Sequence, residues 1–123
     1  MIVAGMISGT SVDGIDVAVA EIRGRRIETL AHASVPYPAP LRARILAASN
    51  ADTHTREISR LNFEIGERFA AAFQRVARGL PVELIGSHGQ TIYHEHGKNG
   101  LQIGVYPVLG NYLSHCSLRE PRE

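Results

Sequence analysis

A turn rich in glycine, hydroxyl and carboxylate groups occupies residues 5–14, which read GMISGTSVDG. Glycines such as Gly9 and Gly14 let a ligand approach the backbone closely, and the amides and hydroxyls of such a turn can donate hydrogen bonds to phosphate oxygens. Asp13 and Asp16 supply oxygen atoms that can hold magnesium or its water molecules. A tight hairpin of turn-forming residues is the alternative, but the loop is longer and more polar than a two-residue hairpin requires. The sequence therefore indicates a phosphate-handling turn.

The turn matches neither of the common nucleotide-binding loops. A Walker loop requires a Lys-Ser or Lys-Thr pair after its last glycine, and the only Gly-Lys pair, Gly97-Lys98, is followed by Asn99. A dinucleotide fingerprint requires a helix after its glycines, whereas the alternating apolar residues within 16–22 predict a strand. The sequence thus predicts a phosphate site of another kind.

A second polar segment, residues 86–91 (GSHGQT), begins where residues 82–86 (VELIG) predict the end of a short buried strand. Groups that contact ligands commonly follow such strands in α/β proteins, so we expect this segment to contact a ligand. A nucleophilic Ser87 with His88 as its base is an alternative. Neighbouring residues of an extended segment point to opposite sides, which disfavours that pair.

Histidine side chains suggest a further alternative, a metal-dependent hydrolase that uses His88, His94 and His96. His94 and His96 would lie on one face of a strand, where both could bind a metal ion. Because no third ligand of fixed spacing accompanies them, solvent-facing histidines of a hairpin are favoured.

Three sequential antiparallel strands are predicted in the first 36 residues. Residues 2–7 form an apolar run typical of a buried strand, and residues 15–19 alternate between larger and smaller side chains. A turn at residues 23–25 (RGR) separates the second strand from the third. The third strand is indicated by residues at period two: Ile27, Thr29, Ala31, Ala33 and Val35.

The clearest helix covers residues 55–78, where apolar residues recur at steps of three and four. This stripe should pack on the sheet. Thr53 or Thr55 can cap the start of the helix, and Gly79 followed by Pro81 ends it. Two further elements are predicted, a short helix over residues 41–48 and a hairpin that pairs residues 91–94 with residues 101–104.

Composition indicates one domain and narrows the classes of partner. With 123 residues, 44% of them hydrophobic and 20% charged, the chain can bury a core of its own. A formal net charge of +1 argues against nucleic acid or an anionic membrane as the partner. Cys116 is the only cysteine, so an internal disulfide is excluded and the reducing cytoplasm is the expected location. The sequence shows no transmembrane stretch and no secretory signal.

Three motifs resemble those of a known family. Residues 5–16 (GMISGTSVDGID), 86–92 (GSHGQTI) and 101–104 (LQIG) occur in the order found in anhydro-N-acetylmuramic acid kinases, and the chain resembles that family over residues 1–104. The resemblance implies an α/β chain with the actin-like ATPase fold of hexokinases and heat-shock ATPases. Residues 1–104 would supply the first lobe, a mixed sheet with helices. Periodicity alone predicts only an α/β or α+β domain.

The resemblance also implies a reaction, with ATP and Mg²⁺ as cofactors. Family members convert 1,6-anhydro-N-acetylmuramic acid and water to N-acetylmuramic acid 6-phosphate in peptidoglycan recycling. The implied partners are ATP and the amino sugar, and the full-length family members would form a homodimer.

Site residues follow from the same resemblance. The implied ATP-binding residues are Gly9, Thr10, Ser11, Val12, Asp13, Gly14, Ile15 and Asp16. The implied substrate-binding residues are Ser87, His88, Gln90 and Thr91. Related sugar kinases often carry an aspartate just before the Gly-Thr pair, where this chain has Met6, so Asp13 and Asp16 are both candidates to hold magnesium.

The catalytic base of the family is not among these motifs. The resemblance implies an aspartate in an Asp-Pro-type continuation after residues 101–104, where this chain reads Val105-Tyr106-Pro107. The catalytic residue is therefore unknown. Residues 105–123 do not resemble the family, so we expect a divergent tail that is translated out of frame after Gly104. The alternative is a true short protein with a divergent tail. The chain would be an amino-terminal kinase fragment or, alternatively, a non-catalytic nucleotide-binding or interaction fragment.

Overall fold

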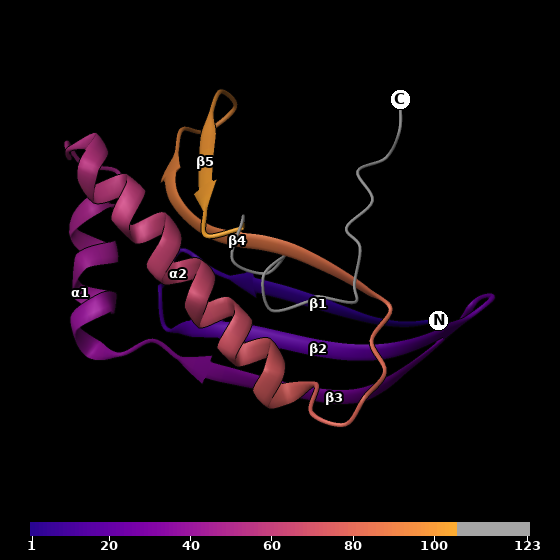
Figure 1. Ribbon diagram of the computed structural model, residues 1–123. Coiled ribbons are helices and arrows are strands. Elements are labelled where there is room, and N and C mark those ends of the chain that lie inside the picture. Colours follow the sequence, from indigo (N-terminus) through magenta and orange to yellow (C-terminus); the bar gives the residue numbers. More distant parts are fainter. Residues whose placement is uncertain (106–123) are drawn as a thin grey trace.

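Five strands and two helices make up residues 1–105, the part of the chain that the computed structural model describes (Figure 1). Along the chain they are β1 (Ile2–Ser8), β2 (Gly14–Arg23), β3 (Arg26–Pro36), α1 (Ala39–Ala48), α2 (Thr55–Val76), β4 (Leu84–His94) and β5 (Gly100–Ile103). The predicted tail lies outside the described residues, apart from Val105.

A single mixed sheet organises the chain, with strand order β3-β2-β1-β4-β5. The first three strands are antiparallel as predicted, and β1 pairs with β4 in parallel. The predicted hairpin closes the sheet as the antiparallel pair of β4 and β5. These pairings confirm the α/β class and the mixed sheet. They also bring the segment after β1 next to the middle of β4, although about eighty residues separate the two.

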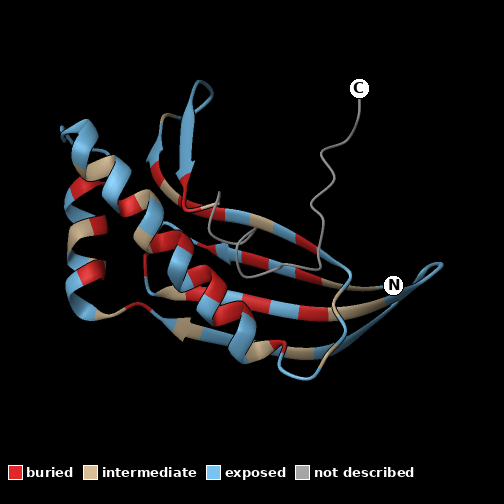
Figure 2. Cartoon of the chain, viewed as in Figure 1, coloured by how far each residue is buried: buried red, intermediate tan, exposed pale blue. Residues whose placement is uncertain are grey.

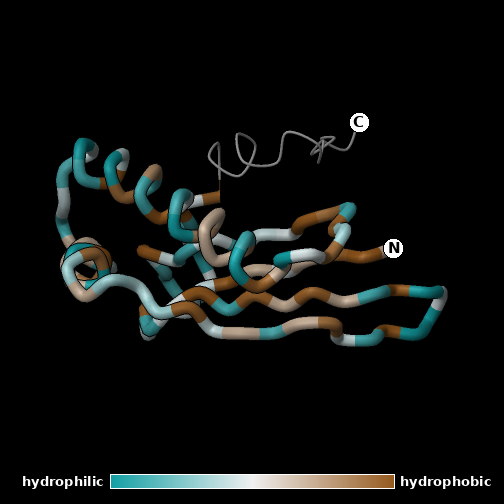
Figure 3. Tube along the Cα trace, turned by 60° about the horizontal axis from the view of Figure 1, so that its bottom comes forward, coloured by the Kyte–Doolittle hydropathy of each residue, from teal (hydrophilic) through white to brown (hydrophobic). Residues whose placement is uncertain are grey.

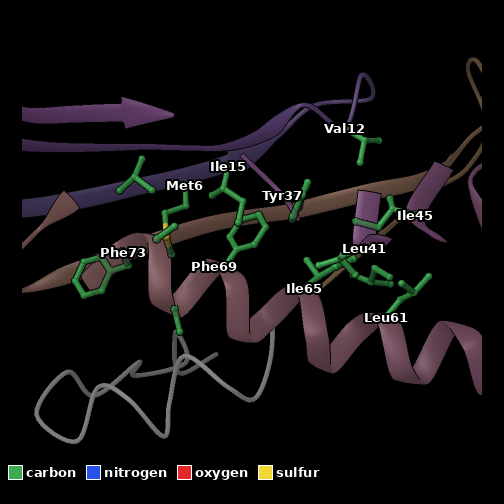
Figure 4. Packing of buried hydrophobic residues seen from close by; sticks show 14 of the residues in the cluster. Met6, Val12, Ile15, Tyr37, Leu41, Ile45, Leu61, Ile65, Phe69 and Phe73 are labelled. Carbon is green, nitrogen blue, oxygen red and sulfur yellow. The ribbon is translucent and has the colours of Figure 1, made fainter. Parts of the chain in front are cut away.

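The core lies between the sheet and α2, because the apolar stripe of the helix faces the strands (Figures 2 and 4). Leu61, Ile65 and Phe69 are fully buried on α2 and belong to one core cluster with Ile15 and Val17 of β2. Phe69 lies next to Ile15 (Figure 4). The predicted stripe is therefore confirmed. Buried apolar surface of this kind is the main favourable term in the stability of the lobe.

The start of α2 differs from the prediction. The N-cap residue is His54, no side chain caps the helix, and Thr55 already lies inside the first turn. The cap by Thr53 or Thr55 is thus wrong, and the carbonyl of His54 instead accepts the first helical hydrogen bond from Ile58 at 3.1 Å. Neighbouring α1 starts at Ala39, where the proline in its first turn is well tolerated.

A β-bulge interrupts the predicted period of β3. Val19 pairs with Ala31 but Ala20 pairs with Thr29, so Leu30 is an extra residue opposite β2. Beyond it, every side chain changes face, and Ile27 is 71% exposed. The expectation of one continuous period-two strand over residues 27–35 is therefore wrong.

The second face of the sheet is bare in the part of the chain that is described. Helix α2 lies along one face, α1 lies at the end of the sheet, and the turned view shows the strands without a helix on the other face (Figure 3). Exposed positions on this open face include Ile7 of β1 and Asp16 of β2. Among the described residues, neither helix has the length and hydrophobicity that crossing a membrane would require.

Candidate functional site

Residues 9–13 join β1 to β2 and lie within the predicted phosphate turn; this segment is the β1–β2 loop. Its amide at Val12 donates to the carbonyl of Gly9 at 3.1 Å, which closes a tight turn. Val12 is completely buried and has a positive φ of 56°, an uncommon conformation for a β-branched residue. Thr10, Ser11 and Asp13 are exposed. Burial of Val12 thus anchors a loop whose polar side chains face solvent.

A depression of about 350 Å³ lies beside this loop, on the open side of the β2–β3 pair. Of the eight residues predicted to bind ATP, five line it: Gly9, Ser11, Asp13, Gly14 and Asp16. Ser34 and Pro36 of β3 complete its wall. Val12 and Ile15 instead turn their side chains into the core, where both are buried. A ligand contact by these two residues would therefore involve backbone atoms.

Two carboxylates, those of Asp13 and Asp16, border the depression and would suit magnesium. Asp16 accepts a hydrogen bond from the hydroxyl of Ser34, and Asp13 lies 3.5 Å from a guanidinium nitrogen of Arg42. Magnesium in kinase sites is held by one or two carboxylates together with phosphate oxygens and water. The donor set at the depression fits that requirement, since both aspartates and the hydroxyl of Ser11 border it.

The histidines within the described residues do not form a metal centre. Residues 1–105 contain no group of three or more His, Cys, Asp or Glu side chains that could hold a metal ion. The alternative that used His88, His94 and His96 is therefore wrong. His94 ends β4 and His96 lies in the turn that follows, so the strand geometry that would pair them is absent there.

Arg42 is a loop contact that the sequence did not indicate. From α1, its Nε donates to the carbonyl of Val12 at 2.9 Å and its Nη2 to the carbonyl of Ser11 at 3.2 Å. The helix that carries it is linked to α2 by Arg44, which pairs with Glu57 and Glu64 at 2.6 Å each. Arg42 lies 30 residues from Val12 in the chain, and no local pattern could have connected the two.

The second polar segment lies inside a strand, which corrects the prediction that it follows one. Residues 87–91 belong to β4, an eleven-residue strand that continues to His94. Two steps along β1, from Met6 to Ser8, match three steps along β4, from Ser87 to Gln90. Gly89 supplies the extra residue with a φ of +70°, a conformation that favours glycine. A strand can therefore pass through this polar sequence without interruption.

The four residues predicted to bind substrate occupy different environments. His88 is exposed on the open face and lines a hollow there, together with Asp16 and His32. Ser87 pairs with the buried Met6 and has a buried hydroxyl that lacks a hydrogen-bond partner among the described residues. Thr91 is half-buried. Ser87 and His88 are neighbours on an extended strand, with the Ser87 hydroxyl buried and His88 exposed, which disfavours a nucleophile and base pair. A sugar contact by any of the four residues stays a prediction.

Gln90 is the residue of this segment that contacts the β1–β2 loop. Its side chain is fully buried, and its Nε2 donates to the carbonyls of Gly9 and Thr91, each at 3.0 Å. Its Oε1 lies 2.6 Å from the hydroxyl of Ser8 and 3.1 Å from that of Tyr37. The amide is thus fully engaged inside the protein, and the structure joins two motifs that are far apart in the sequence.

Stability at alkaline pH should depend on Tyr37. Burial raises the pKa of its hydroxyl to about 12 from 10.0, partly offset by the hydrogen bond with Ser8. Because the folded pKa exceeds the unfolded one, the stabilisation is complete below pH 10 and is lost between about pH 10 and 12. Between pH 8 and 11, urea denaturation should show that the wild type loses about 1.4 kcal/mol more free energy of unfolding than Tyr37→Phe. Equal losses in both proteins would contradict the prediction.

Comparison with known proteins identifies relatives over most of the chain. A family model described as Anhydro-N-acetylmuramic acid kinase matches residues 1–113. Curated proteins of that name are similar to this chain in Gloeothece citriformis (47% identity over 100 residues; 76% of this chain, 26% of the relative) and Trichormus variabilis (48% over 102 residues; 78% and 26%). A third, from Bacillus cereus, is 41% identical over 125 residues (89% and 32%).

The matches cover most of this chain but only part of each relative. The family match passes Gly104, so the similarity extends further than the three sequence motifs. The chain spans only about a quarter to a third of the length of these curated relatives. Out-of-frame translation of residues 105–123 stays a hypothesis.

Proposed function

The chain belongs to the anhydro-N-acetylmuramic acid kinase family, and from this premise we propose that it represents the phosphate-binding lobe of an ATP-dependent sugar kinase. The whole reaction proposed for the full-length protein converts 1,6-anhydro-N-acetylmuramic acid, water and ATP to N-acetylmuramic acid 6-phosphate and ADP. Its place would be the recycling of peptidoglycan. A homodimer of the full-length protein and a cytoplasmic location stay predictions.

The observation that carries the proposal is the meeting of the β1–β2 loop and two carboxylates at one depression. In the proposed role, the exposed hydroxyls of Thr10 and Ser11 donate to phosphate oxygens of ATP. Asp13 and Asp16 would hold magnesium, which when bound offsets the negative charge of the phosphates. Phosphoryl transfer depends mainly on such positioning and charge stabilisation, so a loop fixed from inside the protein suits the role.

The other half of the chemistry requires a different group. Opening the anhydro ring with water requires a base that removes a proton from the water attacking the anomeric carbon. We do not assign this task to Asp13 or Asp16, because both border the depression proposed for the phosphates. The proposal for residues 1–105 is therefore binding and positioning of ATP.

A second candidate is a non-catalytic module that binds nucleotide without transferring its phosphate. It is favoured by the position of both loop carboxylates at the depression proposed for the phosphates, which leaves no residue of 1–105 assigned as the base. Incubating the purified chain with ATP, magnesium and the anhydro sugar separates the candidates. Phosphorylated sugar would support a complete kinase, whereas binding of ATP without product would support the module.

Mg-ATP binding by the 123-residue chain tests the proposed role, and Asp16→Asn is the informative variant. Replacing the carboxylate removes a magnesium ligand, so calorimetry should show at least about a tenfold loss of affinity, equivalent to about 1.4 kcal/mol. In the presence of EDTA the difference between wild type and variant should disappear, because the carboxylate acts through the metal.

Asp52→Asn is the matched control. Asp52 is exposed, belongs to the segment that connects α1 to α2, and does not line the depression. It should bind Mg-ATP as the wild type does. Absence of binding heat with a folded wild-type chain would refute the proposed role. Equal affinity of Asp16→Asn and wild type would remove Asp16 from the site.

A further inference from the structure

Two buried side chains, Gln90 and Ser8, contact the two ends of the β1–β2 loop. At the first end, Gln90 Nε2 donates directly to the carbonyl of Gly9 at 3.0 Å. At the other end, the hydroxyl of Ser8 lies 2.7 Å from the carbonyl of Gly14 and 2.6 Å from Gln90 Oε1. The side chains of Gln90 and Ser8, which contact each other, thus reach the carbonyls at both ends of the exposed part of the loop.

The hydrogen bonds around Gln90 leave little freedom for another arrangement. The hydroxyl of Ser8 has one proton for two acceptors, so Tyr37, whose hydroxyl lies 3.1 Å from Gln90 Oε1, supplies a second donor to this group. Gln90, Ser8 and Tyr37 are all buried, at 0%, 1% and 6% exposure. A buried polar group without a partner costs about 1–3 kcal/mol, so each member of this network depends on the others.

Arg42 binds the same loop from its outer side. Its guanidinium accepts no hydrogen bonds and donates to the carbonyls of Ser11 and Val12. Together, Gln90, Ser8 and Arg42 lie at hydrogen-bond distance from the carbonyls of residues 9, 11, 12 and 14. With these oxygens directed at protein donors, the loop presents fewer acceptors to an approaching phosphate, which would otherwise be repelled by them.

We propose that Gln90 is a positioning residue that keeps the β1–β2 loop in its phosphate-binding conformation, and that it acts through Gly9 and Ser8 rather than by touching the sugar. This inference rests on the proposed role of the loop in binding ATP. It also gives Gln90 a function different from the substrate contact implied by the family resemblance.

Amide hydrogen exchange, measured by NMR on the 123-residue chain without nucleotide, tests the inference apart from ATP binding. Gln90→Met keeps the approximate length of the side chain but removes its donor and acceptor. The amide of Val12, which donates to Gly9, should then exchange at least about tenfold faster, because the partner of Gly9 is lost. The amides of Val17 and Val19 in β2 should keep their protection. Calorimetry should show Mg-ATP affinity reduced by about tenfold.

Gln90→Glu tests the donor of the side chain alone, because it keeps the accepting Oε1 and replaces the donating Nε2 with an oxygen. It should release the Val12 amide as Gln90→Met does. Asn62→Ala is the matched control, since the Asn62 side chain accepts from the amide of Gly104 at 2.8 Å, away from the loop. Loop protection should remain at the wild-type level in this control.

Each outcome decides the inference. Faster exchange at Val12 alone supports positioning, even if the wild type fails to bind Mg-ATP and the proposed function falls. Unchanged exchange at Val12 in folded Gln90→Met overturns positioning, even if ATP binds. Equal acceleration at Val12, Val17 and Val19 assigns Gln90 a general structural role and overturns it as well. If Gln90→Met does not fold, Gln90→Glu replaces it under the same criteria, because it also lacks the nitrogen that donates to Gly9.

Discussion

Gly89→Ala should destabilise the chain by about 2–5 kcal/mol, which is a large fraction of the stability of an ordinary domain. Gly89 has a φ of +70°, where a Cβ atom costs about 1–2 kcal/mol. An added Cβ would also lie 2.5 Å from the carbonyl oxygen of Ile103 and 2.6 Å from Val105 Cγ2. Relief of these overlaps requires β5 to move away from β4, which would disturb the bulge that directs Gln90 into the core.

Gly97→Ala provides a control with the same backbone conformation. Gly97 also has a φ of +70°, but nothing lies within 4 Å of an added Cβ. This variant should lose only the conformational term, about 1–2 kcal/mol. Urea denaturation followed by circular dichroism measures both losses, and the difference between them isolates the steric effect at Gly89. A similar loss in the two variants would show that β5 yields at little cost, contrary to the prediction.

Phe69→Ala should cost about 3–5 kcal/mol, through lost burial and the cavity left in the core. Phe69 is fully buried on the stripe of α2 and lies between the helix and the sheet (Figure 4). In the described part of the chain, one face of the sheet is covered by α2 and the other face is bare. The apolar layer beneath α2 is therefore the main source of stability of residues 1–105.

Phe63→Ala tests the same substitution on the same helix at the surface. Phe63 is 48% exposed, and its replacement should change the free energy of unfolding by less than about 1 kcal/mol. Thermal or urea denaturation of both variants gives the comparison. Equal effects of Phe63→Ala and Phe69→Ala would contradict the assignment of the core to one face of α2.

Structural features that depend on residues close together in the chain could be predicted from the sequence alone. The stripe of α2, its end near Gly79 and the hairpin of β2 and β3 depend on residues close in the chain, because helix and strand periods are local properties of the backbone. The polar turn was also recognisable, since Gly9, Asp13 and their neighbours lie within ten residues. The resemblance to the kinase family, based on such local motifs, is confirmed by the family match.

Local patterns failed where a bulge altered the register. Leu30 in β3 and Gly89 in β4 each add one residue opposite a neighbouring strand, and the side chains that follow change face. Alternation within one strand does not reveal an extra residue, because the bulge is defined by the partner strand. Gly89 offered a signal, since an isolated glycine in a strand often marks a bulge.

The family, most of the elements and the polar chemistry of the β1–β2 loop could be inferred from residue type and short-range spacing. The side chains that hold the loop could not, because they come together only in the folded chain. Gln90 lies 81 residues from Gly9 and Arg42 lies 30 residues from Val12. Their contacts exist because parallel pairing of β1 with β4, and packing of α1 near the loop, bring distant donors to the same carbonyls. Hydrogen bonds of this kind depend on positions in space, which no pattern along the chain encodes.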